Sequence, residues 1–205
     1  MTKFFGRGII TGFARINGYS VGILANDSNF YAGSMSADGA KKTARFVRTC
    51  DTFNIPIVSL VDEPGFLIGP EAESQATILY GTEAVLAVTE STVPWSTVMI
   101  RKSFGVAAAA HYGPDGYVLA WPSAESGPLP LEGGVAVAFK KEIESAKDPE
   151  AKRKEIEQKM SKNQNPFPRA ESFSVHEIID PRKTRFYLSN WADRIQPQMK
   201  AKLFK

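Results

Sequence analysis

The chain has 205 residues, of which 43% are hydrophobic and 23% charged, and its formal net charge is +3 at pH 7. This composition excludes a largely disordered chain, and so small a positive charge gives no support for nucleic-acid binding. No apolar run approaches the roughly 20 residues that a membrane helix needs, and the apolar N-terminal stretch is too short for a signal peptide. The single cysteine, Cys50, excludes an internal disulfide, and its helical surroundings predict a buried structural thiol. We therefore expect a soluble protein of the cytoplasm, or of the mitochondrial matrix if the source is eukaryotic.

The first predicted elements are two strands, residues 8–15 and 19–25. Asn17 and Gly18 lie between them, and both residue types tolerate positive φ, which predicts a hairpin. A loop rich in Gly, Ser and Asn, residues 26–39, leads to a predicted helix over 40–53. The apolar face of this helix is expected to consist of Ala40, Ala44, Val47 and Phe53, with basic residues around it.

The next predicted elements include two turns, each at the end of a strand. The apolar run 57–61 predicts a short buried strand that stops at Asp62, and residues 70–92 predict a long helix bent at Gly81. A second strand, 98–100, is followed by Gly105 and an Ala-rich helix that ends near Gly113. A helix start leaves backbone N–H groups unpaired, so this second turn is a ready anion site without a charged side chain.

The unit of strand, turn and helix occurs again, because residues 117–121 predict a third buried strand. This repetition predicts a layered α/β fold with parallel strands. Residues 121–134 predict a loop, and 163–173 a second loop before a helix near 185–195. We expect a folded core over about residues 8–138, a charged helical segment over 139–162 that breaks at Asp148-Pro149, and a C-terminal segment over 163–205.

Side chains suited to catalysis are few. His111 and His176 have neither a metal-ligand spacing nor a nearby nucleophile motif, so we expect structural or surface histidines and no metal. Asp62 and Glu63 are neighbours in a strand, which directs them to opposite faces and predicts strand-end roles rather than a cooperating acid pair. Backbone N–H groups at the two glycine turns remain as candidates for stabilising an oxyanion, although tight packing turns explain the spacing equally well.

The chain resembles the carboxyltransferase β subunit of biotin-dependent acyl-CoA carboxylases, the propionyl-CoA, methylcrotonyl-CoA and acetyl-CoA group. The matching segments, in order, are GFARINGYSVGILAN, KTARFVRTCDTFNIPIVSLVDEPGFLIG, STVPWSTVMIRKSFGVA, AWPSAE, NPFP and IIDPRKTR. The specific part is VDxPGFxxG followed at this distance by RKxxG. The resemblance implies a crotonase-like ββα spiral with layered sheets and flanking helices. It also implies that the chain corresponds to the C-terminal one of the two such halves in a family subunit.

In that family a carboxyl group moves from carboxybiotin on a carrier protein to an acyl-CoA, and backbone N–H groups stabilise the oxyanion. Carried over by position, the resemblance implies catalytic residues at Gly65, Phe66, Val106 and Ala107. Of these, Gly65, Val106 and Ala107 are also implied to bind the biotin cofactor. The implied substrate-binding positions are Pro64, Gly69, Gly105 and Ala109.

The resemblance also implies partners. These are an N-terminal carboxyltransferase half, a biotin carboxyl carrier and a biotin carboxylase subunit, within a homo- or hetero-oligomer that binds neither nucleic acid nor membrane. In the family the active site lies between the N-terminal half of one protomer and the C-terminal half of another, and the C-terminal half receives biotin.

Several positions depart from the family pattern. RKSFGVA replaces the usual RKxYGGA, so Val106 stands in place of a glycine, and valine disfavours positive φ. Trp95 stands where lysine is common, Ala109 stands at an acyl-selective position, and PLPLEGG at 128–134 differs from the usual MGxxGA. The sequence therefore does not identify the acyl group of the substrate. Two alternatives also stay open: a non-catalytic assembly subunit, and a biotin-independent crotonase-type acyl-CoA decarboxylase.

Overall fold

A single sheet of seven strands forms the centre of the molecule in the computed structural model, which describes residues 2–203 apart from the side chains of 132, 133, 202 and 203. An antiparallel hairpin lies at one edge, and the remaining neighbours pair in parallel. In spatial order the strands are β1 (Ile9–Ile16), β2 (Tyr19–Asn26), β3 (Ile57–Glu63), β4 (Trp95–Phe104), β5 (Tyr117–Ala120) and β7 (Glu177–Ile178), with β6 (Glu125–Gly127) paired to β4.

The predicted hairpin is confirmed. Ile16 pairs with Tyr19, so the connection has two residues, and Asn17 and Gly18 have φ values of 50° and 85°. This conformation matches the twist of the two strands, which is why Asn-Gly favours it.

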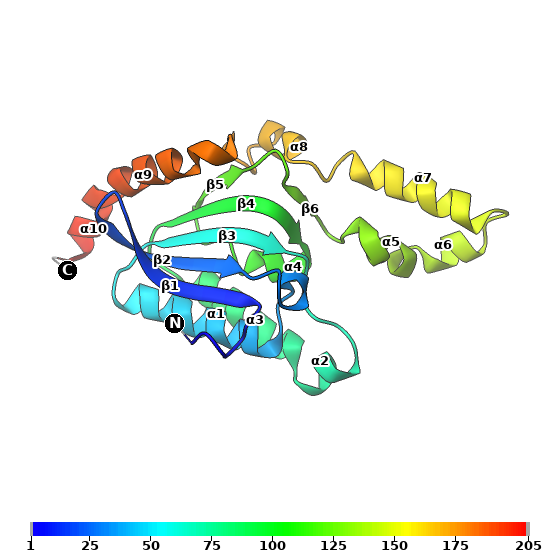
Figure 1. Cartoon of the computed structure of the whole chain (residues 1–205), viewed down its shortest axis with the longest axis horizontal. Helices are drawn as coiled ribbons and strands as arrows, with labels where there is room; N and C mark the ends of the chain where they lie inside the picture. Colours follow the sequence, from blue (N-terminus) through cyan, green and yellow to red (C-terminus); the bar gives the residue numbers. More distant parts are fainter. Residues whose placement is uncertain (1, 204–205) are drawn as a thin grey trace.

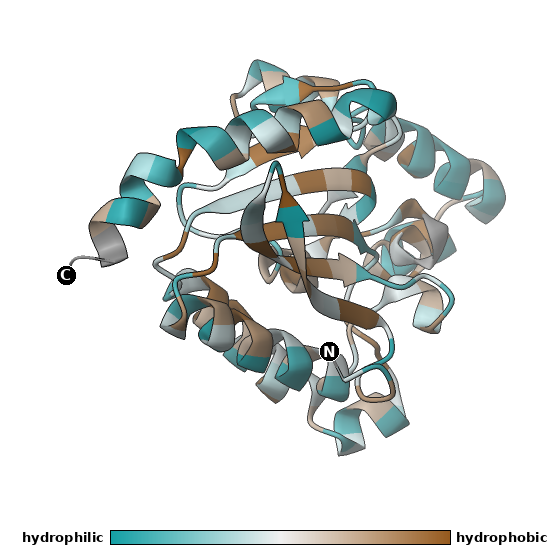
Figure 2. Ribbon diagram, turned by 60° about the vertical axis from the view of Figure 1, so that its left-hand side comes forward, coloured by the Kyte–Doolittle hydropathy of each residue, from teal (hydrophilic) through white to brown (hydrophobic). Residues whose placement is uncertain are grey.

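Helices cover both faces of the sheet (Figure 1). One face packs against α1 (Ala37–Thr52) and α3 (Thr77–Thr89), and the other against α9 (Thr184–Arg194). Successive residues of β3 serve the two layers, since Ile57 packs on the side of α1 and Val58 on the side of α9. Figure 2 shows much of the hydrophobic colour on the central strands and hydrophilic colour on the outermost helices. The predicted layered α/β fold with parallel pairing is therefore confirmed.

The first helix differs from the prediction in its start and its buried face. It begins at Ala37, because the Ser36 side chain accepts a hydrogen bond from the Gly39 N–H and so caps the helix. Phe53 follows the helix and is 70% exposed, so its expected place on the apolar face was wrong; Phe46 and Cys50 fill that layer instead.

Two side chains of α1 have unusual surroundings. Lys42 is one of the basic residues that were expected around the apolar face of the helix. It is buried, and its Nζ donates to the backbone oxygens of Phe5, Gly6 and Ile9. Burial lowers the pKa of Lys42. Cys50 is completely buried, as predicted, and desolvation together with the neighbouring Asp51 raises the pKa of its thiol to about 12.

The segment after β3 forms two helices rather than one bent helix. The short α2 (Pro70–Ser74) ends before Ala76, whose φ of 56° breaks the chain between α2 and α3. Gly81 lies inside α3, where a Cβ would sit 2.4 Å from ring carbons of Phe66. The predicted bend at Gly81 was therefore wrong, and the glycine instead makes room for a packed aromatic ring.

The C-terminal third contains more regular structure than predicted. β6 lies within the expected loop 121–134, and α8 (Phe167–Glu171) within the expected loop 163–173. The break at Asp148-Pro149 is confirmed, because the Asp148 side chain caps the following helix. An arm of three helices extends to one side of the sheet (Figure 1), consisting of α5 (Leu131–Ala138), α6 (Lys140–Glu144) and α7 (Pro149–Ser161).

Four short or terminal elements complete the chain. They are η1 (Tyr31–Gly33), α4 (Gly105–Ala109), η2 (Pro181–Lys183) and α10 (Gln196–Leu203). None of the helices in the part of the chain that the structure describes combines the length and hydropathy needed to cross a bilayer.

Candidate functional site

The two turns predicted from the sequence lie together at the carboxyl ends of the parallel strands. β3 and β4 are parallel neighbours, and Glu63 near the end of β3 pairs with Ser103 near the end of β4. Because parallel strands end at the same edge, residues 64–66 and 105–107 follow directly from adjacent strand ends. The Asp62 carboxylate fixes this edge, since its Oδ1 accepts from Arg101 Nε at 3.1 Å and from the Lys102 N–H at 3.0 Å.

The first turn has one backbone donor in use and one free. Gly65 has φ 130°, and its N–H donates to Glu63 Oε1 at 3.0 Å. The N–H of Phe66 has no acceptor within residues 2–203. Of the two donors expected here, Phe66 is therefore the one that remains for a ligand, and its ring is held against Gly81.

The second turn opens a single helical turn. Gly105 has φ 64° and begins α4, while Val106 and Ala107 occupy its second and third positions. Their N–H groups have no intrahelical acceptor, and no side chain caps them. Positive φ at this turn falls on Gly105, so the strain expected for Val106 does not arise; its side chain is 68% exposed, whereas Ala107 is buried.

The remaining predicted site residues lie on the segments that follow these two strand ends. Pro64 precedes Gly65, Gly69 caps the start of α2 with φ 110°, and Ala109 is exposed at the end of α4. Trp95, which differs from the family pattern, is buried at the amino end of the ten-residue strand β4 and donates to Ser91 Oγ. It therefore does not adjoin the turn at the other end of that strand.

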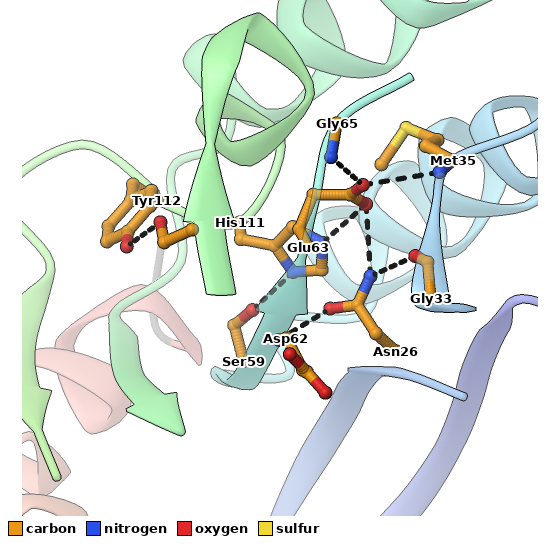
Figure 3. Close-up of polar contacts among 10 residues, drawn as sticks. Asn26, Gly33, Met35, Ser59, Asp62, Glu63, Gly65, His111 and Tyr112 are labelled. Atoms are coloured by element: carbon orange, nitrogen blue, oxygen red, sulfur yellow. Dashed lines mark hydrogen bonds and ion pairs between the residues drawn. The ribbon is translucent and has the colours of Figure 1, made fainter. Parts of the chain in front are cut away.

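The sequence did not reveal that Glu63 and His111 meet (Figure 3). Both are completely buried, and His111 Nε2 lies 3.7 Å from Glu63 Oε2. Glu63 lies on the same face of β3 as Ile57 and Val61, but the run IVSLV does not alternate between apolar and polar residues and so did not mark Glu63 as buried. The sequence around His111 gives no indication that its ring lies next to Glu63. His176 is exposed, and its Nδ1 accepts from the Val118 N–H.

One sizeable cavity lies away from the two turns. This cavity has a volume of about 590 Å³ and lies at the amino ends of β4 and β5, where its lining includes Trp95, Tyr117 and Trp191. Within the described residues, no group of three or more His, Cys, Asp or Glu side chains is placed to hold a metal ion.

The largely parallel sheet thus ends in two adjacent glycine turns that carry backbone N–H groups without acceptors. The fold is the crotonase-like α/β fold of carboxyltransferase domains. It matches the crystal structure of transcarboxylase 12S, a hexamer solved with methylmalonyl-coenzyme A and methylmalonic acid bound, with a TM-score of 0.84 and 39% identity. That match covers 92% of this chain and 37% of the other.

The sequence model of the carboxyl transferase domain family matches residues 1–202, and the chain belongs to that family. It is 41% identical over 186 residues to the carboxyltransferase subunit of propionyl-CoA carboxylase from Haloferax mediterranei. It is equally similar to the α subunit of methylmalonyl-CoA decarboxylase from Propionigenium modestum. Each match covers 88% of this chain but 36% of the relative, so the chain spans about a third of the length of these relatives.

Proposed function

We propose that this chain supplies the biotin side of a carboxyltransferase site, at which a carboxyl group moves from a biotin carrier to an acyl-CoA. The observation that carries the proposal is the free N–H of Phe66 beside a helix start at which the N–H groups of Val106 and Ala107 also lack acceptors. Membership of the carboxyl transferase family supports it. So does the relative named as a propionyl-CoA carboxylase subunit.

Both turns leave open space beside a glycine, as a ligand carbonyl oxygen such as that of the biotin ureido ring requires. Apart from the adjoining residues, no atom lies within 4 Å of the position that a Cβ would take on Gly65, and at Gly105 the nearest is the Pro128 oxygen at 3.5 Å. Both glycines therefore leave room for an oxygen to approach the backbone. The carboxylated carrier is a substrate of this site, and it supplies the carboxyl group.

The contribution of this chain is to stabilise charge and to position groups. As the carboxyl group leaves, negative charge develops on the ureido oxygen, and N–H groups of Phe66, Val106 and Ala107 stabilise it. Loss of one such donor typically costs about 3 kcal/mol of transition-state stabilisation. Glu63 and His111 are fully buried, so neither reaches a substrate proton. Proton transfer from the acyl-CoA is thus left to the bound substrates.

The rest of the site comes from other parts of the enzyme. We propose that an N-terminal carboxyltransferase half holds most of the acyl-CoA, and that a biotin carboxyl carrier and a biotin carboxylase complete the reaction cycle. An oligomer is supported by the hexameric assembly of transcarboxylase 12S. Exposed apolar side chains support association as well; they lie at one end of the sheet and along α3, at Ile68, Ile78, Leu79 and Leu86.

The test is a transfer assay with a matched pair of variants. The chain, its N-terminal half and a ¹⁴C-carboxylated carrier are mixed with propionyl-CoA and other acyl-CoAs, and label in the acyl-CoA is measured. Val106→Pro removes one N–H at a helical position that accepts proline, and it should lower kcat about 100-fold. Val106→Gly keeps the N–H and should keep kcat within about threefold.

Two results would contradict the proposal. One is the absence of transfer at any carrier concentration with every acyl-CoA. The other is equal activity of Val106→Pro and Val106→Gly, which would remove the backbone N–H from the mechanism.

A second candidate function is decarboxylation of a carboxylated acyl-CoA, which the relative named as a methylmalonyl-CoA decarboxylase subunit favours. The same N–H groups would then stabilise the enolate oxygen of the thioester. Avidin separates a biotin-independent decarboxylase from the carboxyltransferase, because it should abolish only the biotin-dependent reaction. The alternative of a non-catalytic assembly subunit rested partly on strain at Val106. Val106 does not have a positive φ, so that argument no longer applies.

A further inference from the structure

A buried polar cluster lies next to Gly65 of the first turn (Figure 3). Its centre is the Glu63 carboxylate. Oε1 accepts from the Gly65 N–H at 3.0 Å and the Met35 N–H at 3.2 Å, and Oε2 accepts from Asn26 Nδ2 at 3.0 Å. We call the following residues the Glu63 cluster: Asn26, Ser59, Glu63 and His111.

His111 completes the cluster from the other turn. Its Nδ1 lies 2.9 Å from Ser59 Oγ, and its Nε2 has no hydrogen bond but lies 3.7 Å from Glu63 Oε2. A lone pair on Nε2 would face a carboxylate oxygen and be repelled, so the proton belongs on Nε2. In the neutral ring the Ser59 hydroxyl then donates to Nδ1.

The cluster joins segments that are far apart in the sequence. Asn26 ends β2, its Oδ1 accepts from the Asp62 N–H, and its Nδ2 also donates to the Gly33 oxygen. His111 lies two residues beyond α4, where its N–H donates to the Ala108 oxygen and its own oxygen accepts from Thr97 Oγ1. The contact between Glu63 and His111 therefore links the first turn to α4.

Burial of a carboxylate and an imidazole in a core carries a large desolvation cost. Apolar side chains of the same volume would usually stabilise a fold as well or better, so the pair is not explained by stability alone. What it does achieve is orientation, because Glu63 takes the Gly65 N–H and leaves the adjacent Phe66 N–H as the free donor.

We propose that Glu63 and His111 are positioning residues that set the spacing between the donors of the two turns; this rests on the function proposed above. Glu63 fixes the peptide planes around Gly65, and His111 holds α4 against Glu63. Neither residue contacts substrate. Both act through the backbone N–H groups of Phe66, Val106 and Ala107.

The experiment uses the complete enzyme, with its N-terminal half and biotin carrier, and the variants Glu63→Gln, His111→Leu and the double variant. Each single variant should lower kcat by about 10- to 100-fold, since displacement of a catalytic group by about 1 Å has effects of this size. The KM for acyl-CoA should change less than about threefold, because the N-terminal half binds it. The double variant should lose less than the product of the two single losses.

Ser96→Ala is the matched control. Ser96 is also completely buried, and its Oγ has no hydrogen-bond partner, but it lies near the amino end of β4, away from both turns. This variant should keep both kcat and KM. Rates are measured well below each melting temperature and normalised to folded protein by near-UV circular dichroism.

A second readout does not depend on activity. Amide hydrogen exchange at Gly65 and at Ala110, whose N–H groups donate to Glu63 and to the Ala107 oxygen, should accelerate at least tenfold in His111→Leu and stay unchanged in Ser96→Ala. If the wild type transfers carboxyl groups but the two single variants keep kcat, the positioning role is wrong. If the wild type transfers none, the proposed function fails, and unchanged exchange in His111→Leu would separately overturn the link between the turns.

Discussion

Replacing Gly81 by alanine should displace the ring of Phe66 and, with it, the first turn. The Cβ of alanine would lie 2.4 Å from Cε1 and Cζ of Phe66 and 3.2 Å from Cε2. Carbon atoms pack best at about 3.5–4.0 Å, so the ring has to move by about 1 Å or more. Because Phe66 also carries the free N–H, this movement reaches the candidate site directly.

Two energies of opposite sign decide the effect on stability. Alanine is favoured over glycine inside a helix by about 1 kcal/mol, whereas overpacking a core costs about 1–3 kcal/mol. The expected sum is a loss of up to about 2 kcal/mol, which lowers the melting temperature by at most roughly 4–8 °C for a chain of this size. Carboxyl transfer should fall by more than stability suggests, up to about 100-fold.

The assay combines urea denaturation with the transfer reaction, and Thr82→Ala in the same helix is the control. Thr82 is exposed, so alanine there should gain helix propensity without a clash. Suppose that Gly81→Ala were instead stabilised by about 1 kcal/mol and transferred carboxyl groups at the wild-type rate. The ring would then move freely, and the argument that it holds the turn in place would be refuted.

Three further predictions concern the rest of the chain. Burial raises the pKa of Cys50 to about 12, so the unfolded chain loses this proton at lower pH than the folded chain. Stability should therefore fall between about pH 8.5 and 12, and Cys50→Ser should flatten this slope in urea titrations. Gly113→Ala should cost about 3 kcal/mol and alter tryptophan fluorescence, since its Cβ would lie 2.1 Å from the Trp95 ring. Asp148→Ala removes a helix cap and should weaken α7 by about 1 kcal/mol, seen as faster hydrogen exchange there alone.

Each of these has a clear contrary outcome. An unchanged alkaline slope would show that the Cys50 thiol titrates normally. Wild-type stability of Gly113→Ala would mean that the indole ring has room to shift. Uniform acceleration of exchange over the whole chain in Asp148→Ala would mean that the cap supports global rather than local stability.

Local patterns in the sequence were sufficient for much of the fold. Asn17-Gly18 determined the hairpin, and Asp148-Pro149 determined the break before α7, because both signals act through the backbone of adjacent residues. Runs of apolar residues located β3, β4 and β5. Phe53 and Gly81 were misinterpreted because helix periodicity does not say where a helix stops or which ring packs against a glycine.

The candidate site, too, was predicted from the sequence only in part. The glycines at 65 and 105 marked the two turns in the sequence, because only positive φ and close backbone approach demand glycine there. The tertiary structure decided which N–H groups stay free, since the Gly65 donor is taken by a carboxylate two residues away. It also decided that Glu63 meets His111, 48 positions later, because that contact depends on parallel pairing of β3 and β4 and on the path of the chain after α4. No local rule contains that information.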